Sequence, residues 1–261
     1  PLTTGRYAIG GAGTQTAGLG FGGYTGTGMA ANTEEYNGSG WSAGGALSTA
    51  RMGLAGAGIQ TAALAAGGAA PGLSTATEEY NGTAWTTSPN SLNTAREGVA
   101  GAGTQTAGLA FGGSVPAVSS ATEEYDGSSW TTSPNSMNTA RRSLAGAGTQ
   151  TAGLAFGGFT TAATNATEEY DGSSWTASGA LNTARIGLAG AGIQTSALAF
   201  GGNIPPSTAA TEKYDGSSWT NGINMGTARG YLIGCGLQAA ALAFGGTPAP
   251  GGALTEEYNF T

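Results

Sequence analysis

The sequence predicts an all-β protein made of six repeats, each of four short antiparallel strands. A double glycine recurs along the 261 residues at intervals of 44 or 45, and this period defines the repeats. The pairs begin at Gly22, Gly67, Gly112, Gly157, Gly201 and Gly245. The segments between them are short and are bounded by Gly, Asn or Asp, as in consecutive β-hairpins. We therefore expect one domain that covers residues 1–261.

The four expected strands follow one another in the same order in every repeat. The first is the segment after an arginine, most often R-x-G-L-A-G-A-G, and a T-Q-T turn leads into the second, which ends at the double glycine. A variable stretch follows, and then the third strand, T-E-E-Y. The segment ATEEYDGSSWT at residues 121–131 shows how an Asp-Gly turn leads from the third strand to the tryptophan that begins the fourth.

Taken together, these marks resemble the kelch motif: an opening arginine, a double glycine, a tyrosine on the third strand and a tryptophan about five residues later. The resemblance covers essentially the whole chain and implies a six-bladed β-propeller of four-stranded blades. The chain departs from the motif at Ala66, where other repeats carry Phe, and in the last repeat, which ends at Thr261 without a tryptophan. Because residues 1–4 match the tail of a fourth strand, we expect either that both termini close the ring in one blade or that the native chain continues beyond them.

Composition excludes several classes of function. There is no histidine, and the one cysteine, Cys235, stands where other repeats carry alanine, so the commonest metal ligand and general base are missing. We predict no metal site, no cofactor and no catalytic residues. A net charge of −7 with eight basic residues argues against nucleic acid as a partner. No segment approaches the ~20 apolar residues that a membrane-spanning helix needs, so we expect no membrane insertion.

The repeated charges indicate structure rather than chemistry. Alternation along T-E-E-Y places the first glutamate and the tyrosine on one face and the second glutamate on the other. The second is replaced by Lys213 in the fifth repeat, so we expect it to be solvated. The first glutamates match the repeat arginines one to one, which predicts six structural ion pairs within the blades. The residues of these pairs are Arg6, Arg51, Arg96, Arg141, Arg185 and Arg229, with Glu34, Glu78, Glu123, Glu168, Glu212 and Glu256.

Binding is expected where the repeats differ. The residue after each arginine and the residue after each double glycine fall on the same face of a propeller, and both positions vary from repeat to repeat. The candidate binding residues on this variable face are Tyr7, Tyr24, Met52, Glu97, Arg142 and Phe159. The opposite face is nearly uniform and carries six turn glutamines, which we expect to cap their turns. Catalysis by the repeated glutamate pair is not expected, because adjacent residues of a strand point to opposite faces.

Three functional hypotheses follow. Repeats this similar, low in charge and rich in Ala, Gly, Thr and Ser, resemble kelch-like propellers of marine phage structural proteins, which implies a virion or phage surface appendage with a recognition face. The alternative is a secreted carbohydrate-binding propeller. A copper-radical oxidase is disfavoured because histidine is absent. The expected partners are other virion or cell-surface proteins and glycans, and the expected location is the virion surface or the extracellular space.

Overall fold

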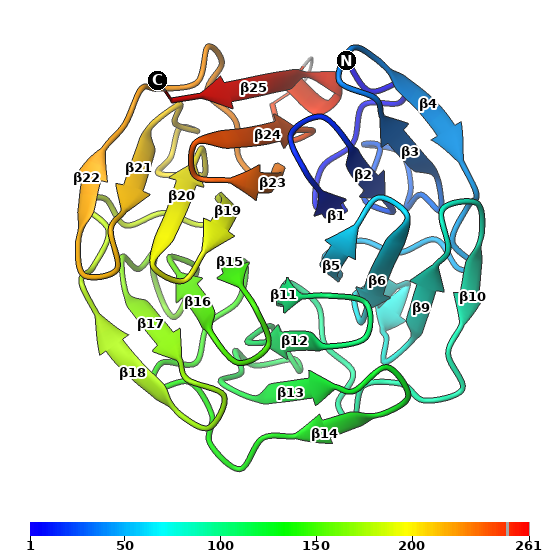
Figure 1. Cartoon of the computed structure of the whole chain (residues 1–261), viewed down its shortest axis with the longest axis horizontal. Coiled ribbons are helices and arrows are strands. Elements are labelled where there is room, and N and C mark those ends of the chain that lie inside the picture. Colours follow the sequence, from blue (N-terminus) through cyan, green and yellow to red (C-terminus); the bar gives the residue numbers. More distant parts are fainter. Residues whose placement is uncertain (249–250, 261) are drawn as a thin grey trace.

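Six β-sheets surround a central axis as the blades of a propeller (Figure 1). The computed structural model describes residues 1–248 and 251–260. In five blades the sheet has four strands in sequence order from the axis outward, and in the sixth it has three. Among the described residues there is one short 3-10 helix, η1 (Gly251–Ala253), and no α-helix. The all-β fold class and the six-bladed propeller are thus confirmed.

The strands have the following bounds. Blade 1 contains β1 (Gly10–Gly13), β2 (Gly18–Phe21), β3 (Thr33–Tyr36) and β4 (Trp41–Gly44). Blade 2 contains β5 (Ala55–Ile59), β6 (Ala62–Ala66), β9 (Thr77–Tyr80) and β10 (Trp85–Thr87), with a small hairpin of β7 (Ala69–Ala70) and β8 (Gly72–Leu73) before β9. Blade 3 contains β11 (Ala100–Gly103), β12 (Gly108–Phe111), β13 (Thr122–Tyr125) and β14 (Trp130–Thr132).

The other three blades repeat this order. Blade 4 contains β15 (Ala145–Gly148), β16 (Gly153–Phe156), β17 (Thr167–Tyr170) and β18 (Trp175–Ser178). Blade 5 contains β19 (Ala189–Ile193), β20 (Ser196–Phe200), β21 (Thr211–Tyr214) and β22 (Trp219–Asn221). Blade 6 contains β23 (Ile233–Leu237), β24 (Ala240–Phe244) and β25 (Thr255–Asn259). The last strand therefore forms the outer edge of blade 6 (Figure 1).

The N-terminal segment packs against blade 6 without adding a strand to it. The Leu2 and Arg6 amides donate to the carbonyls of Ala253 and Gly252, at 2.7 and 2.8 Å. Leu2 therefore has the role of Leu47 and Leu92, whose amides make the corresponding bonds after the fourth strands of blades 1 and 2. Residues 1–4 thus lie in the connection that follows a fourth strand in the other blades, and among the described residues no fourth strand pairs with β25.

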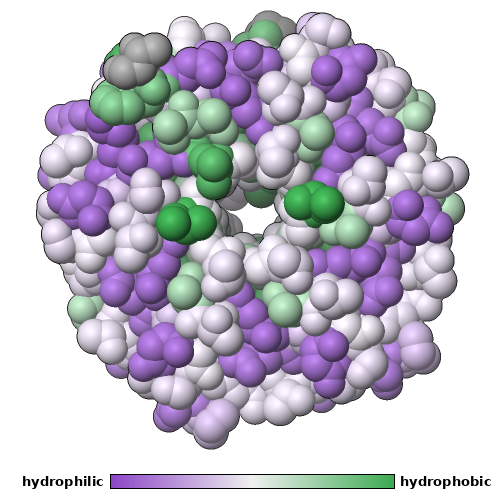
Figure 2. Space-filling model, viewed as in Figure 1, coloured by the Kyte–Doolittle hydropathy of each residue, from purple (hydrophilic) through white to green (hydrophobic). Residues whose placement is uncertain are grey.

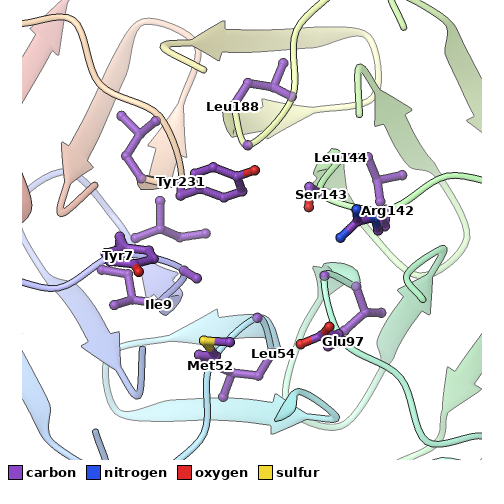
Figure 3. Close-up of a pocket in the computed structure, with 17 residues that line it drawn as sticks. Tyr7, Ile9, Met52, Leu54, Glu97, Arg142, Ser143, Leu144, Leu188 and Tyr231 are labelled. Carbon is purple, nitrogen blue, oxygen red and sulfur yellow. The ribbon is translucent and has the colours of Figure 1, made fainter. Parts of the chain in front are cut away.

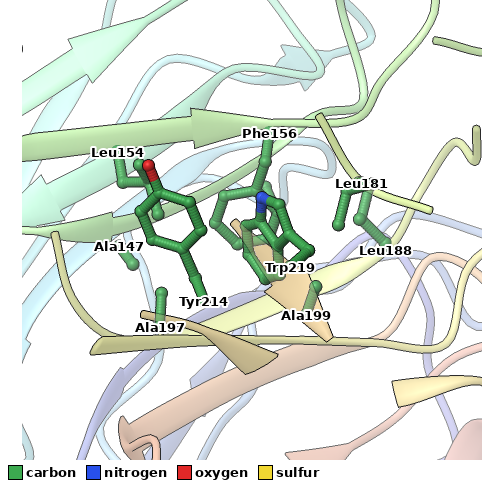
Figure 4. Packing of buried hydrophobic residues seen from close by; sticks show 10 residues of the cluster. Ala147, Leu154, Phe156, Leu181, Leu188, Ala197, Ala199, Tyr214 and Trp219 are labelled. Atoms are coloured by element: carbon green, nitrogen blue, oxygen red, sulfur yellow. The ribbon is translucent and has the colours of Figure 1, made fainter. Parts of the chain in front are cut away.

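The hydrophobic core lies between neighbouring blades. Between blades 4 and 5, the indole of Trp219 packs at 4.9 Å from the rings of both Phe156 and Tyr214 (Figure 4). Aromatic pairs at this spacing add to the free energy gained by burial. Cys235 packs in the corresponding cluster between blades 6 and 1, and its burial raises the pKa of the thiol to about 12. This cysteine is a core residue, as its position in the repeat predicts.

Each repeat arginine lies against the first glutamate of its own repeat. In all six pairs Nη2 is 2.7 to 3.1 Å from Oε1, and every arginine side chain is fully buried. In blade 3, Arg96 Nη1 also donates to the carbonyls of Gly112 and Ala121, while Glu123 Oε2 accepts from the amide of Asn93. The pair thus ties together the end of β12, the start of β13 and the connection before the arginine.

The second glutamate was wrongly expected to be solvated. It accepts a hydrogen bond from the tyrosine hydroxyl of the next blade, as Glu124 does from Tyr170 and Glu79 from Tyr125. Blade 5 carries Lys213 at this position, and Tyr258 Oη has no partner among the described residues. The Glu-to-Lys change therefore removes an acceptor between blades 5 and 6 instead of marking a free surface position.

The turn glutamines also join neighbouring blades, rather than capping their own turns. Gln60 Nε2 donates to the carbonyls of Gly18 and Tyr36 in the preceding blade, at 3.0 and 2.7 Å. Gln15 makes the equivalent contacts to Ala241 and Tyr258 and so helps to close the ring between blades 6 and 1. The uniformity of this face follows from its role in blade packing.

Candidate functional site

A closed circle of backbone hydrogen bonds surrounds the axis on the variable face. Its members are the second residues after the six arginines, and each amide donates to the carbonyl of the member in the preceding blade, at 2.6 to 2.9 Å. All six have positive φ, between 51° and 62°. They are Ala8, Gly53, Gly98, Ser143, Gly187 and Tyr231. This circle fixes the backbone of the preceding residue in each blade, which is the variable one.

A pocket of about 260 Å³ opens on the axis at this circle (Figure 3). The third residue after each arginine is apolar and buried, and these residues form the inner wall. They are Ile9, Leu54, Val99, Leu144, Leu188 and Leu232. The pocket is therefore apolar in its depth, and its polar groups are confined to the rim, an arrangement typical of small-molecule sites.

The rim combines charged and aromatic groups. Arg142 and Glu97 come from adjacent blades and lie on the side of the pocket away from Tyr7 (Figure 3). The two form no ion pair with each other or with any other described residue, so both can meet a ligand. Tyr7, Met52 and Tyr231 complete the rim. The pocket thus offers one cation, one anion and two phenol rings above an apolar wall.

The other two predicted binding residues lie behind the rim and support it. Tyr24 pairs with Tyr7 in an antiparallel bridge, and their rings are 5.5 Å apart. Phe159 pairs with Arg142 in the same way, and the guanidinium carbon lies 5.1 Å from the ring centroid. At this distance a cation–π contact restricts the arginine side chain. The structure therefore brings Tyr7, Met52, Glu97 and Arg142 together, and it places Tyr24 and Phe159 as their supports.

Tyr231 is the site residue that the sequence reasoning missed. It occupies the hydrogen-bonded circle, where three other repeats carry glycine, and its φ is 53°. A Cβ on Gly187 would lie 2.8 Å from Cδ1 of this ring, so the tyrosine lies directly over Gly187. The signal in the sequence was the order Gly230-Tyr231 after Arg229, which puts a large residue where the repeat favours glycine.

Deeper along the axis the channel narrows where the innermost strands approach one another. A cavity of about 90 Å³ lies there, lined in part by Gly11, Gly56, Gly101, Gly146, Gly190 and Gly234. A Cβ on Gly101 would lie 2.6 Å from the Gly56 carbonyl oxygen, so a side chain does not fit between these strands. A ligand of the axial pocket is therefore held near the rim.

The opposite face has a different character around the axis. In Figure 2, hydrophobic side chains lie beside the central opening, over β5, β19 and β23. The first turns of repeats 2, 5 and 6 contain the exposed residues Ile59, Ile193 and Leu237. This face offers scattered apolar side chains and bonded glutamines, and its chemistry is less varied than that of the pocket rim.

The chemistry of the pocket suits binding. Among its lining residues Glu97 is the one carboxylate, whereas acid–base hydrolysis of glycosides uses two. Within the described part of the chain, no three acidic or cysteine side chains come together as metal ligands do. The same residues include no helix long and apolar enough to cross a membrane.

Comparisons with known proteins support the fold. No protein-family model matches the sequence, and no curated protein matches it significantly. Solved structures do match: the structure of YjhT superimposes with a TM-score of 0.78 over 98% of this chain and 95% of that chain. The sequence identity is 12%, so this likeness shows the propeller architecture alone.

Proposed function

We propose that this propeller is a non-catalytic recognition module of a virion or phage surface appendage, and that its ligand binds in the axial pocket of the variable face. The observation that carries the proposal is the rim, where unpaired Arg142 and Glu97 lie across an apolar pocket from Tyr7 and Tyr231. Six nearly identical blades present different side chains here, and a ligand without sixfold symmetry needs different side chains.

A saccharide is the ligand class that this rim fits best. Phenol rings provide flat apolar surfaces for sugar rings. A guanidinium donates hydrogen bonds to sugar hydroxyl groups, and a carboxylate accepts hydrogen bonds from them. The volume of about 260 Å³ suits one or two sugar rings better than a folded partner. A receptor glycan on a host surface therefore agrees with the virion proposal.

The virion assignment is supported by composition and by the repeats. The chain is 9% charged, contains 50 glycines and repeats one design six times, a pattern that resembles the kelch-like propellers of phage structural proteins. The test is proteomic: the protein should be found in stoichiometric amount in purified particles from its source. Finding it only as a free secreted protein would favour the alternative, a secreted carbohydrate-binding propeller.

The binding proposal is tested separately on a glycan array. The wild-type protein should bind a restricted set of glycans, and Tyr231→Ala should lose that binding. Ile193→Ser is the matched control, because Ile193 is exposed on the opposite face. An equal loss in both variants, or a wild type that binds no glycan, would contradict a saccharide site in the pocket.

A further inference from the structure

The axial pocket contains two opposite charges that the protein itself does not neutralise. Glu97 in blade 3 and Arg142 in blade 4 are the charged residues among those that line the pocket. Within the described part of the chain, neither belongs to an ion pair. Both charged groups point from the same side toward the middle of the pocket (Figure 3). A ligand therefore meets an anion and a cation at one edge of an apolar site.

Arg142 is one of the two basic side chains that the repeated ion pairs leave over. The pairs use the six repeat arginines, and the chain has eight Lys and Arg residues in all. The other basic residue left over is Lys213, which lies outside the pocket with Nζ 3.7 Å from the ring centroid of Phe260. The chain carries a net charge of −7, so its overall field repels anions. The guanidinium of Arg142 is therefore a local exception at the pocket.

An aromatic ring of its own blade holds the arginine in place of the carboxylate. The guanidinium carbon of Arg142 lies 5.1 Å from the ring centroid of Phe159, which is a cation–π contact. Glu97 forms the equivalent bridge with Ser114, which brings no cation to the carboxylate. Arg142 is exposed and Glu97 is half-buried, so a ligand can reach both side chains. The two charges are thus kept apart and remain free to bind a ligand.

The two charges together select among ligands. An anionic ligand bonds to Arg142 but is repelled by Glu97, and a cationic ligand has the reverse difficulty. A ligand with both charges satisfies both side chains, and hydrogen bonds to an ionised guanidinium or carboxylate are stronger than neutral ones. Because the two side chains come from adjacent blades and point into the pocket from one side, both charges of the ligand must lie close together on one edge of it.

We infer, resting on the proposed saccharide site, that the pocket recognises an amino sugar that also carries an acidic group. The free ammonium of the sugar donates to the Glu97 carboxylate, and the acidic group accepts from the Arg142 guanidinium. The two substituents stand on neighbouring carbons of one sugar ring. The apolar face of that ring lies against the phenol rings of Tyr7 and Tyr231, which are the aromatic groups of the rim.

The test uses four sugars that share the glucosamine ring and differ in charge. Muramic acid carries an ammonium and, on the neighbouring carbon, an ether with a carboxylate. N-acetylmuramic acid keeps only the negative charge, glucosamine keeps only the positive charge, and N-acetylglucosamine has neither. In calorimetric titrations of the full chain at neutral pH, muramic acid should bind at least roughly tenfold more tightly than each of the other three. Equal affinity for all four sugars would overturn the inference and leave a saccharide site that ignores charge.

Two variants assign each charge of the sugar to its side chain. Glu97→Gln should remove the preference for muramic acid over N-acetylmuramic acid, and Arg142→Gln should remove the preference for muramic acid over glucosamine. Each should weaken the binding of muramic acid roughly tenfold. Asp126→Asn is the matched control, because it removes one negative charge at an exposed turn where Asn37 and Asn81 stand in repeats 1 and 2. It should leave all four affinities unchanged, and a loss equal to that of Glu97→Gln would overturn the assignment.

Two further outcomes would overturn the inference. If glycine binds as tightly as muramic acid, the pocket recognises the zwitterion of an amino acid and not a sugar. If none of the four sugars binds, the charged amino sugar is the wrong class of ligand. The proposed saccharide site fails with it only when the glycan array also shows no binding, so the two failures are distinguished.

Discussion

The hydroxyl of Tyr170 in blade 4 donates to Glu124 Oε1 in blade 3, and this contact crosses the boundary between the two blades. Equivalent contacts join Tyr80 to Glu35 and Tyr125 to Glu79. The T-E-E-Y segment therefore serves two interfaces. Its first glutamate holds the arginine within a blade, and its second receives the tyrosine of the next blade.

Removing one partner of a buried arginine pair should be strongly destabilising. Arg96→Ala leaves Glu123 buried without its cation and removes two donors to backbone carbonyls. We expect a loss of about 3 kcal/mol in the free energy of unfolding, measured by denaturant titration. Arg142→Ala, at an exposed rim position, is the control and should cost about 1 kcal/mol or less. Equal losses in the two variants would contradict the structural role of Arg96.

The second glutamates should contribute less, but measurably. Glu124→Ala removes the acceptor of Tyr170, which keeps a contact with Ser133 Oγ at 3.2 Å. The expected loss is about 1 kcal/mol in the free energy of unfolding. A loss indistinguishable from zero would show that the contact adds nothing.

Lys213 offers the reciprocal experiment. Lys213→Glu restores the acceptor that Tyr258 lacks and should stabilise the protein by about 1 kcal/mol. It also removes the contact of the ammonium with Phe260, where Nζ lies 3.7 Å from the ring centroid. Lys213→Met loses that contact without adding an acceptor, so it separates the two effects. Stabilisation by both variants alike would refute the role of the acceptor.

Stability should fall at alkaline pH as the inter-blade tyrosines ionise. Burial, followed by the hydrogen bond to a glutamate, raises the pKa of Tyr80, Tyr125, Tyr170 and Tyr214 from 10.0 to about 12. A raised pKa in the folded state means that their contribution is complete below pH 10 and is lost as the pH rises toward 12. An absorbance titration of tyrosinate in the folded protein should show a group of tyrosines that ionise only well above the ordinary pKa of 10.0. A single transition of all tyrosines near pH 10 would contradict these contacts.

Tyr24 and Phe159, which lie behind the rim, should affect ligand binding through the rim residues that they contact. Tyr24→Ala and Phe159→Ala should each weaken ligand binding by about 1 to 2 kcal/mol, because Tyr7 and Arg142 lose the rings that position them. Neither ring belongs to a buried cluster between the blades, so the melting temperature should change little. Calorimetric titration measures the affinity and thermal unfolding measures the melting temperature. A lower melting temperature without a loss of affinity would contradict this role of the two rings.

Much of the fold could be predicted because the same physical requirement is repeated six times. The double glycines set the period, and the equal numbers of repeat arginines and first glutamates predicted the pairing seen at Arg96 and Glu123. The role of the second glutamate could not be predicted in this way. Strand alternation shows which face Glu124 lies on, but its partner Tyr170 belongs to another blade, 46 residues away.

The candidate site was predicted in part for a similar reason. Variation between repeats identified Tyr7, Met52, Glu97 and Arg142, which do line the pocket. It missed Tyr231, because that residue lies in the backbone circle and not at the variable position. A positive φ at a tyrosine is uncommon, and here it depends on hydrogen bonds to both neighbouring blades. The Tyr231 carbonyl accepts from the amide of Ala8, and the Tyr231 amide donates to the carbonyl of Gly187. Such a circle exists only after the ring has closed.

The most direct test of the central claim is to locate a bound ligand by chemical-shift perturbation. The protein would be titrated with the strongest glycan from the array while backbone amides are observed. Recognition in the axial pocket predicts the largest shifts at Ala8, Gly98, Ser143 and Tyr231, whose amides belong to the circle beneath the rim. Shifts confined to the turns that contain Gln60 and Gln194 would place the ligand on the opposite face and contradict the account.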